Sequence, residues 1–364
     1  MESTDMVKVL MVSGSWPPQP CGVGDYADTL CEHLMAAGIA IEKYGHRDFS
    51  RPYSPSIMRQ IAATDSDVVH IQYPTVGFGR SLTPSMIARV VRTRPVVVTL
   101  HEYAVFRPYR RAWFSPFAHH CSARIFTVPP ERDLFAARFP ARNGLDDIIE
   151  IASNIPAAPA RERTADRVIY FGLIAPNKGL EDFVALARKA NSESSGFAFE
   201  LIGAVSEKDR NYADAILADA KSVGVELSLS LPRDRVAEQL ATATYAYLPF
   251  PDGASAKRGS LAAAMVNGVV TLTRHTALTP DWLRQATRHA ADTETALSGL
   301  KALRDNQADL DRMKAQTVNA ATRFRWDSIA RRHADLYAQL LATKTSDVSG
   351  NGRRSAESMA SLNA

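Results

Sequence analysis

Two similar strand–loop–helix openings, about half a chain apart, constrain the fold more than any other feature of this sequence. The first runs from an apolar strand at 7–12, through a glycine- and proline-rich loop at 13–25, into a helix from Tyr26. The second runs from a strand at 168–172, through a loop ending at Gly179, into another helix. Such junctions bring backbone N–H groups and the positive end of a helix dipole close to an anion. The pair predicts two nucleotide-fold halves that face each other across a cleft.

Short β-rich runs alternate with helical patterns after both openings, which predicts an α/β fold with parallel sheets covered by helices. In the first half we expect strands at 7–12, 39–44, 68–72, 96–101, 124–128 and 147–151, and helices that include 26–37 and 83–92. In the second half we expect strands at 168–172, 197–202, 225–231, 245–248 and 269–273, separated by helices at 180–190, 209–223, 234–243 and 259–267. From Leu297 onward the pattern is wholly helical.

The chain length of 364 residues exceeds the size at which a single core usually stops growing, so two domains are expected. We predict a first domain over 1–157 and a second over 165–325, joined by an aperiodic linker at 157–164. A further helix at 326–342 follows. The tail at 343–364 is rich in Ser, Asn and Gly, lacks aromatic residues, and is expected to be disordered.

The composition, 46% apolar and 23% charged residues with a net charge of +4, is typical of a soluble globular protein and does not indicate nucleic-acid binding. The first residues lack the pattern of a secretory signal, and no apolar run approaches membrane-spanning length. Cys21, Cys31 and Cys121 have no metal-binding spacing and are expected to be free thiols. We therefore expect a cytoplasmic protein.

The first loop matches a dinucleotide-binding pattern, G-x-G-x-x-[GA], through Gly22, Gly24 and Ala27, with Glu42 at the end of the next strand. This match alone would indicate a nicotinamide or flavin enzyme. The spacing opposes that function, because about ten residues separate the strand from the first glycine of a fingerprint that normally leaves the strand directly. A glycine-rich loop that serves only the turn is the structural alternative.

Three segments together resemble the retaining glycosyltransferases of family 4, which have the GT-B fold. They are the first loop from Ser13 to Tyr26, the second from Phe171 to Gly179, and the stretch from Gly259 to Val270. The resemblance covers about residues 7–342. Segments 71–74 and 152–156 are also similar to a bacterial polysaccharide-assembly branch of that family. The resemblance implies two doubly wound Rossmann-like domains and a C-terminal helix that crosses back to the first domain.

The resemblance further implies a nucleotide-diphosphate sugar in the second domain and an acceptor in the first. Lys178 matches the family's phosphate-binding lysine, just before a helix start, although an exposed loop lysine is the plain alternative. Leu173 stands where the family usually has arginine. The family's Glu-x7-Glu pair, which contacts the donor, falls on Ser255 and Ala263, so both carboxylates are missing. Either donor recognition has been rebuilt or sugar transfer has been lost.

The local sequence before the third segment favours rebuilt recognition. Lys257 and Arg258 directly precede Gly259 and Ser260 at a helix start, which offers cationic groups, backbone N–H groups and a hydroxyl to one anion. A solvated turn with a serine helix cap is the alternative. The full predicted donor-binding set is Gly22, Val23, Gly24, Gly172, Lys178, Lys257, Arg258, Gly259, Ser260 and Leu261.

His101 follows a buried strand at the sheet edge where open α/β sheets place ligands. The resemblance implies contact with the transferred sugar, so His101, Lys178 and Arg258 form the predicted catalytic set; a histidine that only bonds the sheet edge is the alternative. His101 and Glu102 do not complete an H-E-x-x-H motif, because Val105 stands at the fourth position on, and no other cluster has metal-ligand spacing. No metal site is predicted.

An arginine- and aromatic-rich segment follows at 107–120, with Arg107, Arg110, Arg111 and Trp113. This combination suits an acceptor with a lipid diphosphate or a peripheral contact with the inner membrane surface. An ordinary amphipathic helix with buried aromatics is equally compatible.

The sequence thus predicts a retaining, metal-independent glycosyltransferase. It would use a nucleotide-diphosphate sugar as co-substrate, with no other cofactor, and a glycan or lipid-linked acceptor. A non-catalytic sugar-nucleotide or glycan-binding protein on the same fold is the alternative, and an oxidoreductase is a more distant one.

Overall fold

The computed structural model describes residues 6–205 and 207–360, which form two six-stranded sheets surrounded by helices. The first sheet has the strand order β2-β1-β3-β4-β5-β6 and the second β12-β11-β10-β7-β8-β9. All neighbouring strands in both sheets are parallel. The predicted α/β fold class is therefore confirmed. Contacts divide the chain into two units, one with residues up to Glu150 and from Trp326 onward, the other with Ile151–Arg325.

The inner strands of the first unit are buried on both faces, as expected for parallel strands under helices, and its two edge strands are only partly buried. Its strands are β1 (Lys8–Val12), β2 (Ala40–Tyr44), β3 (Val68–Tyr73), β4 (Val96–Leu100), β5 (Ala123–Phe126) and β6 (Leu145–Ile148). Its helices are α1 (Gly22–Ala36), α2 (Pro55–Ala62), α3 (Thr83–Val90), α4 (Pro108–Arg111), α5 (Ser115–His120), α6 (Pro129–Arg138) and α14 (Trp326–Ala360), with short 3-10 turns η1 (Arg47–Ser50), η2 (Val76–Phe78) and η3 (Ala112–Phe114).

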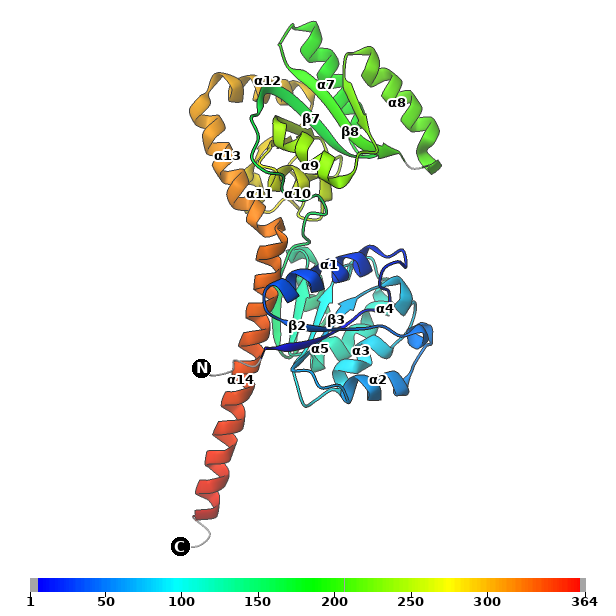
Figure 1. The fold of residues 1–364 in the computed structure, drawn as a ribbon, viewed down its shortest axis with the longest axis vertical. Helices are drawn as coiled ribbons and strands as arrows, with labels where there is room; N and C mark the ends of the chain where they lie inside the picture. The colour runs from blue at the N-terminus through cyan, green and yellow to red at the C-terminus, as the bar shows by residue number, and fades with distance from the viewer. Residues whose placement is uncertain (1–5, 206, 361–364) are drawn as a thin grey trace. The chain divides into compact units, whose positions relative to one another are not determined.

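Helices cover both faces of the first sheet. Helices α1 and α14 pack together on one face, while α3 contacts both α2 and α5 on the other (Figure 1). The face under α2, α3 and α5 holds an apolar core, to which β3 contributes Val69, Ile71 and Tyr73. Helix α14 belongs to this unit although it follows the whole second unit in sequence, and Tyr337 of α14 reaches His70 of β3.

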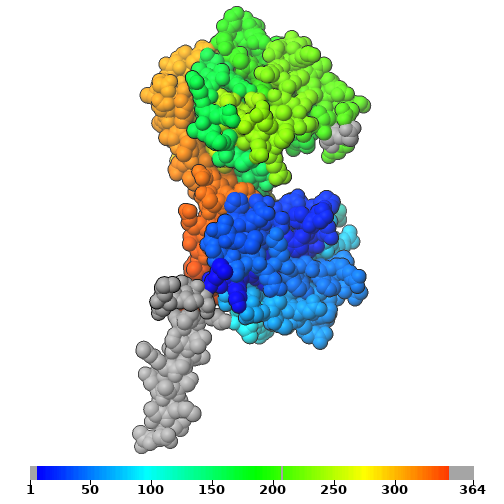
Figure 2. Space-filling view, viewed as in Figure 1, coloured from blue at the N-terminus to red at the C-terminus, as the bar shows by residue number. Residues whose placement is uncertain are grey.

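The second unit repeats the same layering. Its strands are β7 (Thr164–Ile174), β8 (Ala198–Val205), β9 (Glu226–Leu229), β10 (Ala243–Leu248), β11 (Val270–Thr273) and β12 (Thr287–His289). Its helices are α7 (Leu180–Ser192), α8 (Arg210–Ser222), α9 (Arg233–Thr242), α10 (Gly259–Val266), α11 (Asp281–Ala286), α12 (Thr293–Asp305) and α13 (Gln307–Ala321), with 3-10 turns η4 (Glu207–Asp209) and η5 (Thr322–Phe324). Figure 2 shows one face of each unit in space-filling form, coloured by residue number.

Several boundaries differ from those expected. The units divide between Glu150 and Ile151, ahead of the predicted linker, so residues 151–164 belong to the second unit. Strand β12 was not predicted, because a three-residue edge strand is too short to show periodicity. Helix α1 begins at Gly22 rather than Tyr26.

The last helix also runs further than expected. Helix α14 continues to Ala360, where composition predicted disorder from 343. This stretch contains Gly350 and Gly352 but no proline, and glycine weakens a helix without breaking it. The rest of the predicted tail, 361–364, lies outside the described residues.

Candidate functional site

A cavity of about 580 Å³ opens at the carboxyl edge of the second sheet. It lies where the strand order reverses, because β7 leads to β8 and β9 on one side while β10 leads to β11 and β12 on the other. Open parallel sheets bind ligands at such a switch point. The lining residues come from the ends of β7 and β8, the loop after β10, the start of α10 and the segment ahead of β7: Ile151, Ala152, Asn154, Ile155, Tyr170, Phe171, Gly172, Leu173, Lys178, Ala204, Phe250, Lys257, Arg258, Gly259 and Ser260.

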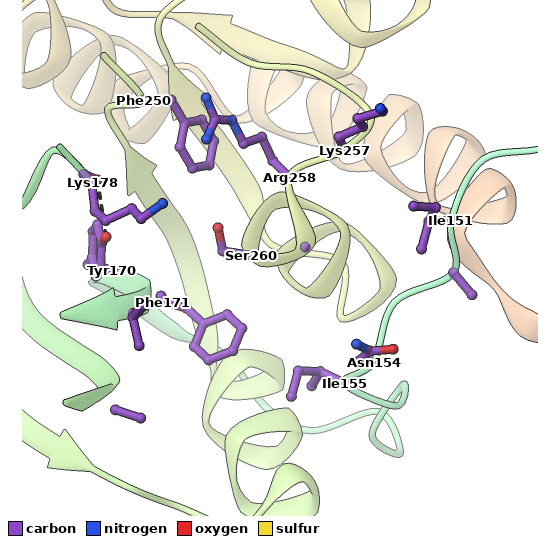
Figure 3. A pocket seen from close by; sticks show the side chains of 15 residues that line it. Ile151, Asn154, Ile155, Tyr170, Phe171, Lys178, Phe250, Lys257, Arg258 and Ser260 are labelled. Atoms are coloured by element: carbon purple, nitrogen blue, oxygen red, sulfur yellow. Dashed lines mark hydrogen bonds between the residues drawn. The ribbon is translucent and has the colours of Figure 1, made fainter. Parts of the chain in front are cut away.

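Lys178 reaches this cavity because of the backbone of its loop. The next residue, Gly179, has φ +79°, and a Cβ atom there would lie 2.1 Å from the carbonyl oxygen of Pro249. Only glycine allows this approach, which packs the loop against the segment that follows β10. The Tyr170 hydroxyl donates to the Lys178 carbonyl over 3.1 Å and fixes the other side of the loop. The half-buried ammonium group extends into the cavity (Figure 3).

Arg258 enters the same cavity as the residue that precedes α10. Its guanidinium carbon lies 4.8 Å from the centroid of the Phe250 ring, a cation–π contact. The guanidinium also forms an ion pair with Asp252, whose side chain is 76% exposed. Arg258 is therefore held in place, and one part of its charge is already engaged by an exposed carboxylate.

The amino end of α10 adds backbone donors. Its cap residue, Arg258, makes no side-chain hydrogen bond to the first turn, and the first amides of a helix have no acceptor within it. Gly259 leaves the approach open, since a Cβ atom there would meet nothing within 4 Å. The Ser260 hydroxyl points toward the Lys178 side of the cavity (Figure 3). Two cations and a helix amino end thus converge on one space, which suits an anion with several oxygen atoms.

The other predicted donor residues are placed less uniformly. Gly172 and Lys257 line the cavity, but the Lys257 side chain points away from Lys178 (Figure 3). Leu261 is fully buried and is not part of the lining. Leu173, in the position of the family's arginine, lines the cavity with a 44% exposed, uncharged residue.

Sequence reasoning missed the apolar walls of the cavity. Tyr170, Phe171, Ile155 and Phe250 all contribute to the lining, together with Asn154. Asn154 and Ile155 lie in segment 152–156 and Phe171 opens segment 171–179, both already noted for their resemblance. Tyr170 and Phe250 carry no signal of their own, because strand and loop aromatics are usual in protein cores.

The first opening belongs to the other unit. Gly22, Val23 and Gly24 form the first turn of α1, where the Cys21 sulfur accepts from the Gly24 N–H over 3.4 Å. A Cβ atom at Gly24 would lie 2.6 Å from the Ser15 carbonyl oxygen, so this glycine serves close packing of the loop. None of the three lines the cavity of the second unit, and their contact with a donor stays a prediction.

A second cavity, of about 550 Å³, lies within the first unit at the carboxyl ends of β1, β2 and β3. Its wall includes Trp16, Gln19, His46 and Arg47. The Trp16 indole is fixed because its Nε1–H donates to the Tyr44 carbonyl over 3.2 Å. A fixed aromatic ring beside polar side chains suits a sugar.

His101 lies just beyond β4 and is 3% exposed. Its Nε2 atom is 2.9 Å from Oε1 of Gln72, and its ring meets the edge of Tyr26 with centroids 5.1 Å apart. These contacts anchor the imidazole in the first unit, as the sheet-edge alternative requires. They do not test contact with a sugar.

The basic segment packs on its own aromatic residues. The Arg110 guanidinium lies 5.0 Å from the Phe106 centroid and 5.1 Å from that of Trp113. Arg111 lies over Tyr103 and donates to the Ala104 carbonyl over 2.7 Å. Arg107 is exposed ahead of α4. The segment therefore presents stacked arginines at the surface, and its predicted acceptor role is untested.

Within 6–205 and 207–360, no group of three or more His, Cys, Asp or Glu side chains could hold a metal ion. No helix in this part of the chain is long and apolar enough to span a bilayer. Cys21, Cys31 and Cys121 are buried free thiols, as predicted.

Comparisons with solved structures identify the architecture. A chain of a GtfA/B complex matches with a TM-score of 0.58 and 12% identity; the match covers 79% of this chain and 59% of that one. Sucrose-phosphate synthase from Thermosynechococcus elongatus matches with a TM-score of 0.61 and 15% identity; the match covers 93% of this chain and 100% of that one. HepE from Anabaena, in complex with UDP, matches with a TM-score of 0.64 and 12% identity; the match covers 92% of this chain and 100% of that one. No model of a protein family matches the sequence, and neither does any curated protein. The chain therefore has the GT-B fold of these glycosyltransferases, as predicted.

Proposed function

We propose that this protein is a glycosyltransferase that moves a sugar from a nucleotide-diphosphate donor to a glycan or lipid-linked acceptor with retention of anomeric configuration. One observation carries the proposal: Lys178, Arg258 and the amino end of α10 converge on a single cavity at the switch point of a GT-B unit. The cavity, about 580 Å³, falls within the usual size range of small-molecule sites.

The chemical task is to stabilise the charge that develops on the leaving diphosphate. The acceptor oxygen attacks the anomeric carbon on the face from which the diphosphate departs. The bond from that carbon to the phosphate oxygen breaks, and the departing oxygen takes both the electron pair and the acceptor's proton. Lys178 supplies a point charge, Arg258 a planar pair of donors, and α10 its amides, all preorganised. The lining residues include no carboxylate, so we assign the charge stabilisation to protein cations rather than to a metal ion.

The acceptor would bind to the first unit. Trp16, Gln19 and Arg47 in its cavity suit a sugar residue. His101, which is not part of that lining, would contact the transferred sugar, as the resemblance implies. The segment with Arg107, Arg110, Arg111 and Trp113 would contact a lipid diphosphate or the inner face of the membrane. We further propose a cytoplasmic location with this peripheral contact.

Titration calorimetry with a panel of nucleoside diphosphates tests the donor site. UDP comes first, because the solved complexes of HepE contain UDP and glucose. Lys178→Ala and Arg258→Ala should each weaken binding roughly tenfold or more, since a hydrogen bond to a charged group is worth about 1.5–3 kcal/mol. Lys178→Arg should rescue only part of the loss. Lys221→Ala, an exposed lysine on α8, is the matched control and should bind like the parent. Parent-like binding by both cavity variants would mean that the site is elsewhere.

Release of nucleoside diphosphate in the presence of candidate acceptors separates enzyme from binding protein. A non-catalytic sugar-nucleotide or glycan-binding protein is favoured by one observation, the absence of both family carboxylates at Ser255 and Ala263. Affinity without any release across the donor panel would support that alternative. Where release occurs, the anomeric proton coupling of the product tests retention.

A further inference from the structure

Four buried side chains of the first unit form a hydrogen-bonded chain from α14 to the end of β4. The Tyr337 hydroxyl lies 2.6 Å from His70 Nδ1, and His70 Nε2 lies 3.2 Å from Gln72 Nε2. Gln72 Oε1 lies 2.9 Å from His101 Nε2. His70, Gln72 and Tyr337 are 0% exposed and His101 is 3% exposed. Buried polar atoms need partners of the right kind, so an amide that can only donate through nitrogen and accept through oxygen constrains the direction of the bonds beside it.

The amide of Gln72 determines the protonation of His101. The Gln72 amide nitrogen also lies 3.4 Å from the thioether sulfur of Met11. That sulfur has no hydrogen to donate, so the NH₂ side of the amide faces it and the oxygen side faces His101. An amide oxygen can only accept a hydrogen bond. The proton in this contact therefore belongs to Nε2 of His101.

The same amide fixes the proton on His70. Its NH₂ group donates to His70 Nε2, which also lies 2.8 Å from the Thr99 hydroxyl. Burial, with His333 and His101 nearby, lowers the pKa of His70 well below its ordinary value, so the ring is neutral at pH 7. Because Nε2 accepts, the single ring proton is on Nδ1 and is donated to the Tyr337 hydroxyl.

We propose that Gln72, His70 and Tyr337 are positioning residues that hold His101 in its Nε2-protonated tautomer, and that α14 sets this tautomer through Tyr337. Helix α14 also fixes the ring plane, because Trp326 packs on Tyr26 at 5.1 Å and Tyr26 packs on His101 at 5.1 Å. The role of His101 in sugar transfer rests on the proposed function, where the tautomer decides whether its other ring nitrogen accepts or donates a hydrogen bond. The tautomer itself is a property of the free protein.

Nitrogen-15 NMR of the histidine-labelled full chain tests the proposal without any ligand, with the His101 signals assigned from His101→Gln. In the parent protein, His101 should show a protonated Nε2 and an unprotonated Nδ1. Tyr337→Phe removes the acceptor of the His70 Nδ1–H bond, so the His70 proton moves to Nε2 and is donated to Thr99. The Gln72 amide then has to turn, and His101 should change to the Nδ1-protonated tautomer.

Two further variants and a control keep the test decisive. Gln72→Leu should give a mixture of His101 tautomers, whereas Thr99→Val leaves every bond direction intact and should change nothing. Tyr103→Phe is the matched control, because the Tyr103 hydroxyl is buried in the same unit without a hydrogen-bond partner among the described residues. A parent protein with His101 protonated at Nδ1 overturns the proposal, as does a folded Tyr337→Phe protein with unchanged His101 signals. If Tyr337→Phe does not fold, the parent and Gln72→Leu spectra decide.

An activity measurement connects the tautomer to catalysis. Gln72→Leu should lower turnover by up to about a hundredfold, the cost of a small misplacement of a reacting group. UDP affinity should stay within about twofold, because the cations of the donor cavity lie in the other unit. Normal turnover with a disturbed tautomer would remove the positioning role. Absence of turnover in the parent would refute the proposed function and leave the tautomer result standing.

Discussion

Replacing Asp252 by asparagine should tighten the binding of a nucleoside diphosphate to the second unit. The Asp252 carboxylate forms an ion pair with Arg258, so a ligand phosphate has to share or displace this contact. The Asp252 side chain is 76% exposed and that of Arg258 is 22% exposed, which puts the pair among surface ion pairs rather than buried ones. Such pairs are worth roughly 0.2–1 kcal/mol, so Asp252→Asn should lower the dissociation constant for UDP by roughly 1.4- to fivefold.

Calorimetric titration of UDP into four proteins forms the double-mutant cycle: the parent, Asp252→Asn, Arg258→Ala and the combination. The gain from Asp252→Asn should vanish in the Arg258→Ala background and should shrink as salt is added, because exposed charges are screened. Asp219→Asn, which removes an exposed ion pair with Arg188 in the same unit, is the control and should leave affinity unchanged. Weaker binding by Asp252→Asn, or an equal gain without Arg258, would refute the competition between carboxylate and ligand.

Four other substitutions test the remaining assignments. His101→Ala should lower turnover at saturating donor more than donor affinity; unchanged turnover per folded molecule would remove His101 from the catalytic set. Trp16→Ala should weaken acceptor binding, measured as KM, and leave UDP affinity intact, whereas an unchanged KM would move the acceptor elsewhere. Gly179→Ala should destabilise the protein by about 1–3 kcal/mol in urea unfolding, because alanine at φ +79° is strained and its Cβ meets Pro249; parent-like stability would contradict this packing. Burial lowers the pKa of His333 from 6.5 to about 4 in the folded protein. Above pH 6.5 this histidine is neutral in both the folded and the unfolded protein, and its burial costs the fold no stability. As the pH falls from 6.5 toward 4, the unfolded protein takes up a proton that the folded one does not, and the free energy of unfolding drops by on the order of 3 kcal/mol. The free energy of unfolding of His333→Leu should therefore depend less on pH over this window.

The fold could be predicted from the sequence because apolar residues repeat with different periods in strands and in helices. The alternation of strands and helices also restarts at Val168, which indicates a second unit. The loop around Lys178 was accessible for a related reason, since a glycine at a helix start after a buried strand has few other uses. The start of helix α1 was expected at Tyr26 because Gly22 and Gly24 are poor helix formers, but the helix begins at Gly22. Tertiary packing of the loop, seen in the close approach of Gly24 to Ser15, overrides that propensity.

Contacts between side chains of different loops and strands could not be predicted from the sequence. Nothing in the sequence pairs Arg258 with Asp252 or stacks it on Phe250, because both contacts depend on how the loop after β10 folds back. The lining by Phe171 and Asn154 likewise depends on which strand ends meet at the switch point. The sequence places His70 and Gln72 on a predicted strand, and Gln72 also in segment 71–74. Only the position of α14 gives the two side chains a common chain of hydrogen bonds.

The return of α14 to the first unit has a consequence for biosynthesis. The second unit is one continuous stretch, Ile151–Arg325, and can complete its own core as soon as that stretch has left the ribosome. The first unit cannot complete its core at that stage, because the hydrogen-bond partner of His70 is Tyr337, which is synthesised 267 positions later. Until then, the face of the first sheet that α1 shares with α14 stays partly uncovered, while the second unit is already able to fold. Synthesis from the amino terminus therefore finishes the first half of this protein last.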